Sequence, residues 1–124
     1  MNPGPETDAL VAEKVMEWKR IQFTTITGFQ RVGKVDGWEA DPPYKDFYGV
    51  EQVQVWPAPP FSTDIRAAME VVGKMRTTHG FGTFTLEQNK SGDWSVGGWG
   101  FFPTIYEDTA PMAICVAALK ACDE

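Results

Sequence analysis

The sequence predicts one α+β domain spanning residues 1–124: a three-layer α-β-α sandwich with three helices and a mainly antiparallel sheet of four to five strands. Helical hydrophobic patterns occur near the start, the middle and the end of the chain, and segments rich in β-branched and aromatic residues lie between them. Turn sequences join the β segments locally, which favours antiparallel pairing. Helices on both faces of the sheet would then bury its apolar side chains.

The first helix is expected over residues 7–20. Leu10, Val11, Val15 and Trp18 recur on one face at helical spacing, and the charged residues between them fall nearer the opposite face. This apolar face requires a sheet or another helix to pack against.

The segment that follows favours strands. Residues 21–35 are rich in Thr and β-branched residues, with Gly28 and Gly33 as breaks, and predict two strands or a hairpin. Asp36-Gly37 is a turn signal, and the consecutive prolines at 42–43 exclude a central strand. We therefore expect a long, specialised loop over residues 36–50.

Residues 50–56 predict a strand, which the prolines at 57–60 end before a second helix. Ser62 or Thr63 is expected to cap that helix, and Asp64 suits the positive end of its dipole. The apolar stripe expected on this helix consists of Ile65, Met69, Val72 and Met75 or Arg76.

His79-Gly80 is a typical helix end, because glycine readily adopts a left-handed conformation. Residues 81–87 and 94–102 predict a hairpin around the turn residues 89–93. A third helix is expected from Asp108 or Thr109, with Ile114 and several alanines on its packing stripe.

Charge and composition exclude several functional classes. The net charge of -6 argues against a general nucleic-acid binder. No segment approaches the roughly 18 to 20 consecutive apolar residues needed to cross a bilayer. The amino terminus has neither the basic nor the apolar region of a secretory signal, so we expect a cytoplasmic protein. Cys115 and Cys122 are separated by about 10 Å along a helix, too far for a disulfide, and are expected to be reduced.

Three separated blocks resemble the phage ABA sandwich domain: residues 10–18, residues 62–65 with 69–72, and residues 108–115 with 117–121. The resemblance implies an α-β-α sandwich encoded by a bacteriophage or prophage, with no characterised molecular function and no catalytic residues to carry over. Two features depart from the family's pattern. Phe61 stands where a proline is expected, and residues 28–60 form a longer segment than usual.

Two groups of aromatic residues are candidates for ligand or partner binding. Around residues 94–102, glycines allow close approach of a flat ligand and the indoles provide stacking faces, although packing beneath the helices is the favoured alternative. Around residues 38–56, aromatics flank a proline-rich segment and suit a protein anchor, although local loop packing is again favoured. With two basic residues able to hold phosphate, the candidate residues are Arg31, Lys34, Trp38, Tyr44, Phe47, Tyr48, Trp94, Trp99 and Phe101.

No catalytic or metal-binding motif is evident, and no cofactor is expected. His79 is the only histidine, and it has a structural explanation as a helix-end residue. Gly97-Gly98-Trp99-Gly100 is not a phosphate loop, because no Gly-Lys-Ser/Thr follows. An enzyme is therefore the least favoured class.

Binding is the expected activity. One hypothesis is a counter-defence protein that sequesters a host nucleotide signal. The other is an acidic inhibitor or adaptor that binds a host protein, and a phage structural accessory is a third alternative. A symmetric homo-oligomer that doubles a ligand pocket would fit the first hypothesis.

Overall fold

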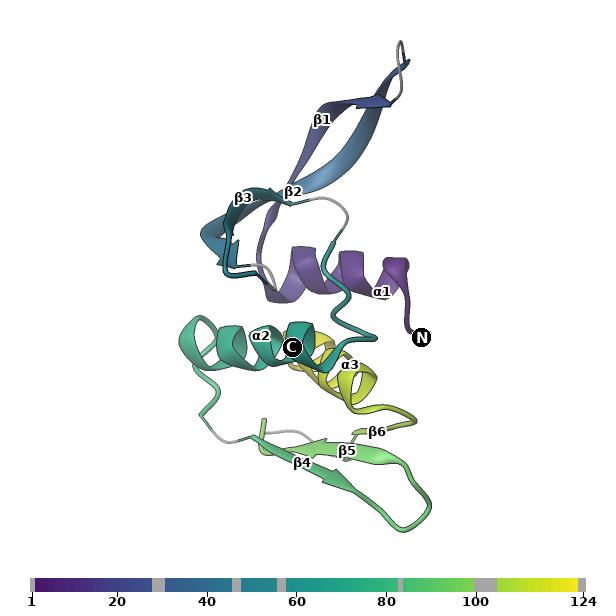
Figure 1. Cartoon of the computed structure of the whole chain (residues 1–124). Coiled ribbons are helices and arrows are strands. Elements are labelled where there is room, and N and C mark those ends of the chain that lie inside the picture. Colours follow the sequence, from purple (N-terminus) through teal and green to yellow (C-terminus); the bar gives the residue numbers. More distant parts are fainter. Residues whose placement is uncertain are drawn as a thin grey trace.

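The structure is a computed structural model that describes residues 2–27, 31–45, 48–55, 58–82, 84–99 and 105–122. The helix α1 (Pro5–Leu10) continues directly into the π-helical segment η1 (Val11–Val15) (Figure 1). The remaining elements are β1 (Lys19–Thr27), β2 (Arg31–Lys45), β3 (Glu51–Val55), α2 (Ile65–Thr77), β4 (Thr85–Gln88), β5 (Trp94–Gly97), β6 (Ile105–Glu107) and α3 (Ala110–Cys122).

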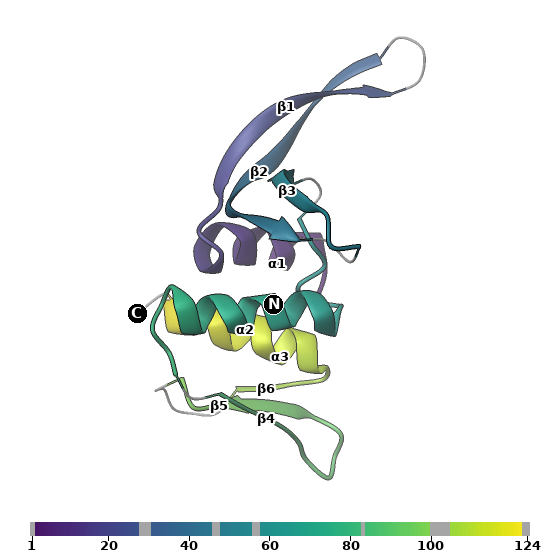
Figure 2. The same cartoon turned by 60° about the vertical axis from the view of Figure 1, so that its left-hand side comes forward.

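The predicted α+β sandwich of three helices and antiparallel strands is confirmed. The strands form two sheets, with the orders β1-β2-β3 and β4-β5-β6, where one sheet of four to five strands was expected. Figures 1 and 2 show the helices lying between these two sheets, where helices on both faces of one sheet were expected. Among the described residues, no helix combines the length and apolarity that crossing a membrane requires.

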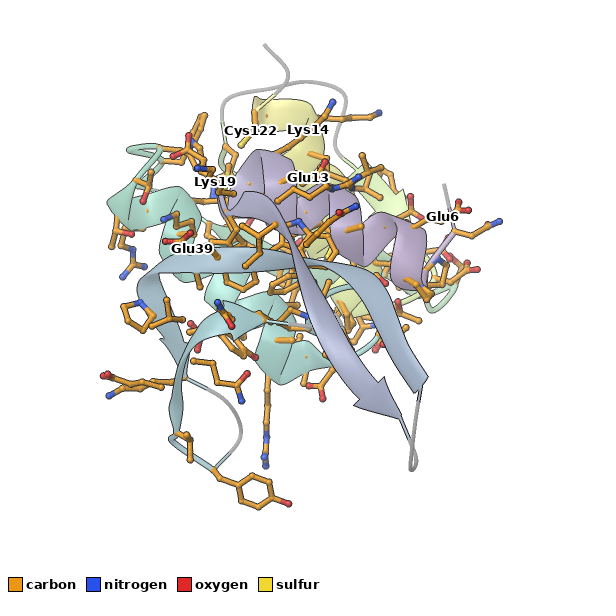
Figure 3. The ribbon with its side chains drawn as sticks, turned by 90° about the horizontal axis from the view of Figure 1, so that it is seen from above. Glu6, Glu13, Lys14, Lys19, Glu39 and Cys122 are labelled. Atoms are coloured by element: carbon orange, nitrogen blue, oxygen red, sulfur yellow. The ribbon has the colours of Figure 1, made fainter. Side chains whose placement is uncertain are left out.

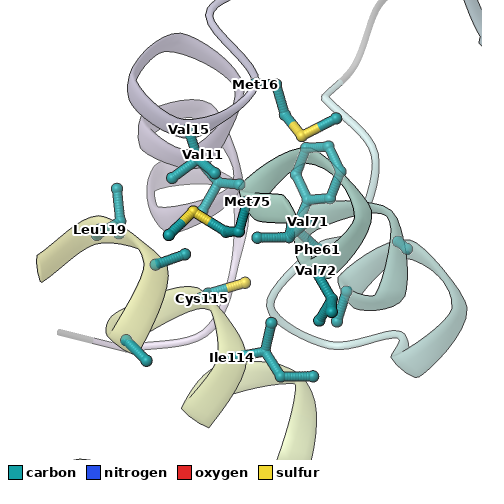
Figure 4. Close-up of a cluster of buried hydrophobic side chains, with 14 of the residues drawn as sticks. Val11, Val15, Met16, Phe61, Val71, Val72, Met75, Ile114, Cys115 and Leu119 are labelled. Carbon is teal, nitrogen blue, oxygen red and sulfur yellow. The ribbon is translucent and has the colours of Figure 1, made fainter. Parts of the chain in front are cut away.

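The third helix explains why the helices lie inside the molecule. In α3, Ala110 and every residue from Met112 to Leu119 are buried. A helix that is apolar all round must be covered on all sides. It packs against α2, η1 and the strands β5 and β6. Figure 4 shows Val11 and Val15 of η1, Met75 of α2 and Cys115 of α3 converging in the resulting core.

The first helix ends five residues before the predicted end, at Val15, and strand β1 begins at Lys19. The reversal is made by Glu17, which has a φ of 57°, in the left-handed region. The amide of Trp18 then donates a hydrogen bond of 3.0 Å to the carbonyl of Ala12. This arrangement resembles a glycine-type helix end, but no glycine marks it in the sequence.

We expect Glu17→Gly to raise the free energy of unfolding by about 0.5 to 1 kcal/mol. Glycine adopts the left-handed conformation without strain, whereas the Cβ of glutamate makes it unfavourable. This gain exceeds the conformational entropy that glycine loses on folding. Urea denaturation followed by tryptophan fluorescence measures the change. Arg76→Gly, at an exposed helical position of α2, is the control and should lower stability by about 1 kcal/mol. A loss of similar size in both variants would show that Glu17 is not strained.

The predicted hairpin over residues 21–35 is confirmed, but it extends further than expected. β1 and β2 pair continuously from Lys19 opposite Glu39 to Thr27 opposite Arg31, so Gly33 does not break the ladder. The predicted turn at 36–37 is wrong, because both residues pair with β1. Arg20 ties the base of the hairpin to the first helix through an ion pair with Glu13, which is labelled in Figure 3. The rest of the hairpin projects away from the helices (Figure 1).

The loop expected over residues 36–50 is β-strand as far as Lys45. The prolines at 42–43 are accommodated because they lie between Glu39 and Tyr44, where the pairing of β2 with β3 shifts register. β1 also ends its pairing opposite Glu39. A proline lacks an amide hydrogen, and at this irregular point no ladder bond is lost. Residues 48–50 lie outside the strands.

The second helix begins and ends close to the predicted positions, but its cap and buried face differ. Asp64 is the N-cap, and its Oδ1 accepts a hydrogen bond of 2.8 Å from the amide of Arg66. The face expected from the larger residues is rotated, because Ile65 and Met69 are exposed. The residues that α2 buries are Ala67, Ala68, Val71, Val72 and Met75. The predicted end is confirmed: Gly80 has a φ of 75° and Phe81 donates to the Met75 carbonyl.

Ser62, one of the two expected caps, is instead fully buried and joins the start of α2 to α1. Its amide and its hydroxyl both donate to Oδ1 of Asp8, over 2.8 and 2.7 Å. The Ser62 hydroxyl oxygen accepts a hydrogen bond of 2.8 Å from the amide of Gly4. Asp8 is 6% exposed, so a carboxylate lies inside the molecule with its partners supplied from 54 residues away. We call these contacts the Asp8–Ser62 junction.

The hairpin expected over residues 81–102 is present in a shorter form. β4 and β5 pair from Thr85 opposite Gly97 to Gln88 opposite Trp94. The turn is held by Asn89, whose Oδ1 accepts from the amide of Asp93. A further strand, β6, pairs with β5 and was not predicted, because its three residues are too short to show a pattern.

Candidate functional site

A groove runs between α2 and the end of the first sheet, the β1-β2-β3 sheet. Its first compartment has a volume of about 500 Å³. The second has about 330 Å³ and shares Tyr44, Lys45 and Glu70 with the first. We call the two compartments together the α2 groove. The first is lined by Tyr44, Lys45, Gln52, Val55, Pro59, Pro60, Asp64, Arg66, Ala67 and Glu70, and the second by Met16, Trp18, Pro43, Tyr44, Lys45, Glu70, Gly73, Lys74 and Thr77.

The charges of the α2 groove differ from those of the whole chain. Among the described residues that line it, Lys45, Arg66 and Lys74 are cationic, and Asp64 and Glu70 are acidic. The chain as a whole has 11 Lys and Arg against 17 Asp and Glu. The lining of the groove thus carries three cations against two carboxylates. The groove is therefore a locally basic region of an acidic protein.

Tyr44 is the aromatic residue that lines both compartments. The ring of Tyr44 makes an edge-on contact with Trp18, with ring centroids 5.6 Å apart and an interplanar angle of 68°. Trp18 in turn packs on the fully buried Phe61, with centroids 5.9 Å apart. Tyr44 is half-buried, so part of its surface faces the groove while the rest is fixed by packing.

The residues predicted around 38–56 separate into different environments. Tyr44 lines the groove, whereas Trp38 is only 6% exposed and belongs to the core. Its ring lies 6.0 Å from the guanidinium carbon of Arg20, and its indole nitrogen has no hydrogen-bond partner among the described residues. Tyr48 is 85% exposed, and Phe47 lies outside the described residues. The structure therefore keeps Tyr44 and Tyr48 as accessible candidates.

The described candidates around 94–102, Trp94 and Trp99, pack against the core. Trp99 is 3% exposed and packs on Phe84 at a centroid distance of 5.2 Å, and Trp94 is half-buried against the core. A Cβ at Gly97 would lie 2.9 Å from Oγ1 of Thr85 on the neighbouring strand, so this glycine permits close strand packing. Phe101 lies outside the described residues. Packing is thus sufficient to explain the described members of this segment.

The two predicted basic residues are not at the groove. Arg31 and Lys34 pair with Thr27 and Thr24 of β1, near the far end of the hairpin, whereas the groove is lined by the opposite end of β2. The charged residues that prediction missed are Lys45 of β2 and the α2 residues Arg66, Glu70 and Lys74, which form a row at a spacing of four. This row lies on one helix face, but the same pattern is typical of a solvated surface.

Cys115 and His79, two of the described residues whose side chains suit catalytic chemistry, each have a structural environment. Burial, with a smaller contribution from the negative charge of Asp8, raises the pKa of the Cys115 thiol from 9.0 to about 12. The ring nitrogen Nε2 of His79 is hydrogen-bonded to the Val15 carbonyl at 2.8 Å. Within the part of the chain that the structure describes, no three His, Cys, Asp or Glu residues form a group able to hold a metal ion.

The raised pKa predicts that the two cysteines react differently. At pH 9, a folded sample treated with iodoacetamide should gain one adduct, at the half-buried Cys122, because Cys115 stays protonated and covered. In denaturant both should react. Mass spectrometry of the alkylated protein checks this, and rapid labelling of Cys115 in the folded state would contradict its burial.

The same pKa difference makes the stability of the protein depend on pH. The Cys115 thiol loses its proton near pH 9 in the unfolded chain but only near pH 12 in the folded protein, so the free energy of unfolding should fall as the pH rises from about 9 to about 12.

Comparison with known proteins gives a family and a fold. The family described as the phage ABA sandwich domain matches residues 9–119. A 2.0 Å crystal structure of a phage protein from Bacillus cereus ATCC 14579 superimposes with a TM-score of 0.64 and 21% sequence identity, over 100% of this chain and 90% of the other. No protein in the curated set matches significantly.

Proposed function

The chain belongs to the phage ABA sandwich domain family, and from this premise we propose that it is a phage-encoded binding protein without catalytic activity that captures an anionic, aromatic ligand of the nucleotide class in the α2 groove. In the cytoplasm of the host bacterium, this capture removes a nucleotide signal and acts as counter-defence.

The observation that carries the proposal is the local reversal of charge. Lys45, Arg66 and Lys74 line a groove on a protein whose net charge is -6. Long-range repulsion of an anion by the acidic surface is screened over roughly 10 Å at ordinary salt concentration, whereas hydrogen bonds from Arg and Lys to phosphate act at contact distance. An anionic ligand is therefore favoured inside the groove.

Shape supports the same ligand class. Pockets for small ligands are typically about 300 to 1,000 Å³, and each compartment of the groove falls in that range. Tyr44 is fixed by Trp18, so it presents a ring surface without the loss of side-chain entropy that a free tyrosine would suffer on binding. Stacking on such a ring is worth about 1 to 3 kcal/mol per base.

A second candidate function rests on a different surface. Tyr48, Val50 and Val53 are 85%, 56% and 52% exposed, at and just before β3. Exposed apolar side chains on an acidic protein suit an inhibitor or adaptor that binds a host protein.

Native mass spectrometry of the protein purified from phage-infected cells separates these functions. A nucleotide mass released on denaturation is the result expected from the groove. Retention of a host protein without a small ligand would favour the surface at Tyr48. A protein with nothing bound would overturn the ligand proposal and leave a structural role in the phage particle as the alternative.

A further inference from the structure

Strand β1 forms one edge of the first sheet, with the order β1-β2-β3. It has nine residues, and among the described residues its strand neighbour is β2 alone. The hairpin it belongs to projects away from the helices (Figures 1 and 2). One long row of backbone amide and carbonyl groups is therefore available at this edge.

The other sheet edges are built differently. β3, β4 and β6 have five, four and three residues, and each contains one carboxylate: Glu51, Glu87 and Glu107. Short length and charge are the usual means by which proteins prevent edge-to-edge association. In β1, both charged residues lie at the start, and the seven residues 21–27 are uncharged and rich in β-branched residues. This edge has the composition of a strand with neighbours on both sides.

We propose that β1 pairs antiparallel with β1 of a second copy of this chain, about a two-fold axis perpendicular to the sheet. The two sheets then become one continuous sheet of six strands, in the order β3-β2-β1-β1-β2-β3. All nine residues of β1 pair when Phe23 of one copy lies opposite Phe23 of the other.

The distribution of charge selects this orientation. In the antiparallel register, Lys19 lies opposite Thr27 of the second copy and Arg20 lies opposite Ile26, so no like charges meet. In a parallel arrangement, Lys19 and Arg20 would each lie opposite themselves. Like charges directly opposite on paired strands are destabilising.

The dimer is independent of the proposed ligand. β1 pairs with residues 31–39 of β2, whereas the α2 groove is lined by residues 43–45 at the other end of that strand. Pairing of one edge is a modest interface, so we expect a dissociation constant in roughly the micromolar range.

Charge substitutions at Gln22 and Thr24 test the contact, because in this register Gln22 of one copy lies opposite Thr24 of the other. Gln22→Lys/Thr24→Lys and Gln22→Glu/Thr24→Glu each place two pairs of like charges across the interface. Within one chain these positions pair with Asp36 and Lys34, so each variant gains one favourable and one unfavourable neighbour. Gln22→Lys/Thr24→Glu is the comparison variant: it places opposite charges at both places across the interface and gains two favourable neighbours within its own chain.

Analytical ultracentrifugation and native mass spectrometry give the outcome. The unmodified protein should dimerise reversibly, the two like-charge variants should be monomers, and their mixture should form heterodimers. The Gln22→Lys/Thr24→Glu variant should dimerise about twofold to tenfold more tightly than the unmodified protein. If the like-charge variants fail to fold, the comparison of Gln22→Lys/Thr24→Glu with the unmodified protein tests the proposal by itself. A monomer at about 100 μM, undiminished homodimers of the like-charge variants, or open assemblies larger than a dimer would overturn the proposal.

Discussion

Asp8→Ala should lower the free energy of unfolding by about 3 to 5 kcal/mol, because the buried amide of Ser62 loses its acceptor and the Ser62 hydroxyl keeps only a long contact of 3.5 Å to the Gly4 carbonyl. Hydrogen bonds to a charged group contribute about 1.5 to 3 kcal/mol each, and an unsatisfied buried donor costs about 1 to 3 kcal/mol. The Asp8–Ser62 junction also joins α1 to the start of α2, so its loss removes a polar contact between two helices of one core. Thermal and urea denaturation measure the change.

Two further variants distinguish the junction from a general effect of losing a carboxylate. Asp8→Asn keeps one oxygen acceptor and should lose less stability than Asp8→Ala. It should also lower the pKa of Cys115, because the negative charge of Asp8 helps to raise it. Glu87→Ala, at an exposed position of β4, should change stability by no more than about 0.5 kcal/mol. A loss below about 1 kcal/mol in Asp8→Ala would contradict the buried, paired carboxylate.

Neutralising two cations of the α2 groove should weaken nucleotide binding by about 100-fold or more. In Lys45→Gln/Arg66→Gln, two charge-assisted contacts to phosphate are lost, and each is worth about 1.5 to 3 kcal/mol. Glutamine is shorter than lysine or arginine, but it keeps a flexible polar side chain at each position. Isothermal titration calorimetry with the nucleotide identified by mass spectrometry, or otherwise with a panel of nucleoside phosphates, measures the dissociation constants.

The matched control changes the net charge by the same amount at a distance from the groove. Lys90 and Lys120 are exposed, in the β4–β5 turn and in the last turn of α3. Lys90→Gln/Lys120→Gln should leave the dissociation constant within about twofold, because screened charges beyond a Debye length contribute little. Equal weakening by both pairs would indicate a net-charge effect and would contradict a ligand site in the groove. Both variants should unfold within a few degrees of the unmodified protein.

The fate of the aromatic residues shows why the candidate site was only partly predictable. Tyr44 and Trp99 both follow segments of irregular composition, and neither has a local pattern that reports its burial. Tyr44 lines a groove because Trp18, Pro43 and α2 surround it, and Trp99 is buried because Phe84 and the core cover it. Exposure of a side chain depends on these distant neighbours.

The buried face of α2 illustrates the same limit. Large apolar residues predicted a stripe through Ile65 and Met69, yet the helix buries Ala67, Ala68 and Val71. The small residues of α2 allow α3 to approach closely. The packing of α2 against α3 therefore decided which face of α2 is buried. Helical periodicity identifies an amphipathic helix, but it does not identify the partner against which a face packs.

By itself, the sequence determined the α+β class, the β1–β2 hairpin, the end of α2 at Gly80 and the position of α3, because each depends on hydrogen bonds and conformational preferences of residues near one another in the chain. Only the tertiary structure decided the division into two sheets, the left-handed turn at Glu17, the Asp8–Ser62 junction and the α2 groove. Three of these features depend on residues that the fold brings together from distant parts of the chain. The turn at Glu17 uses a residue type that does not ordinarily adopt that conformation, so surrounding packing must hold it there.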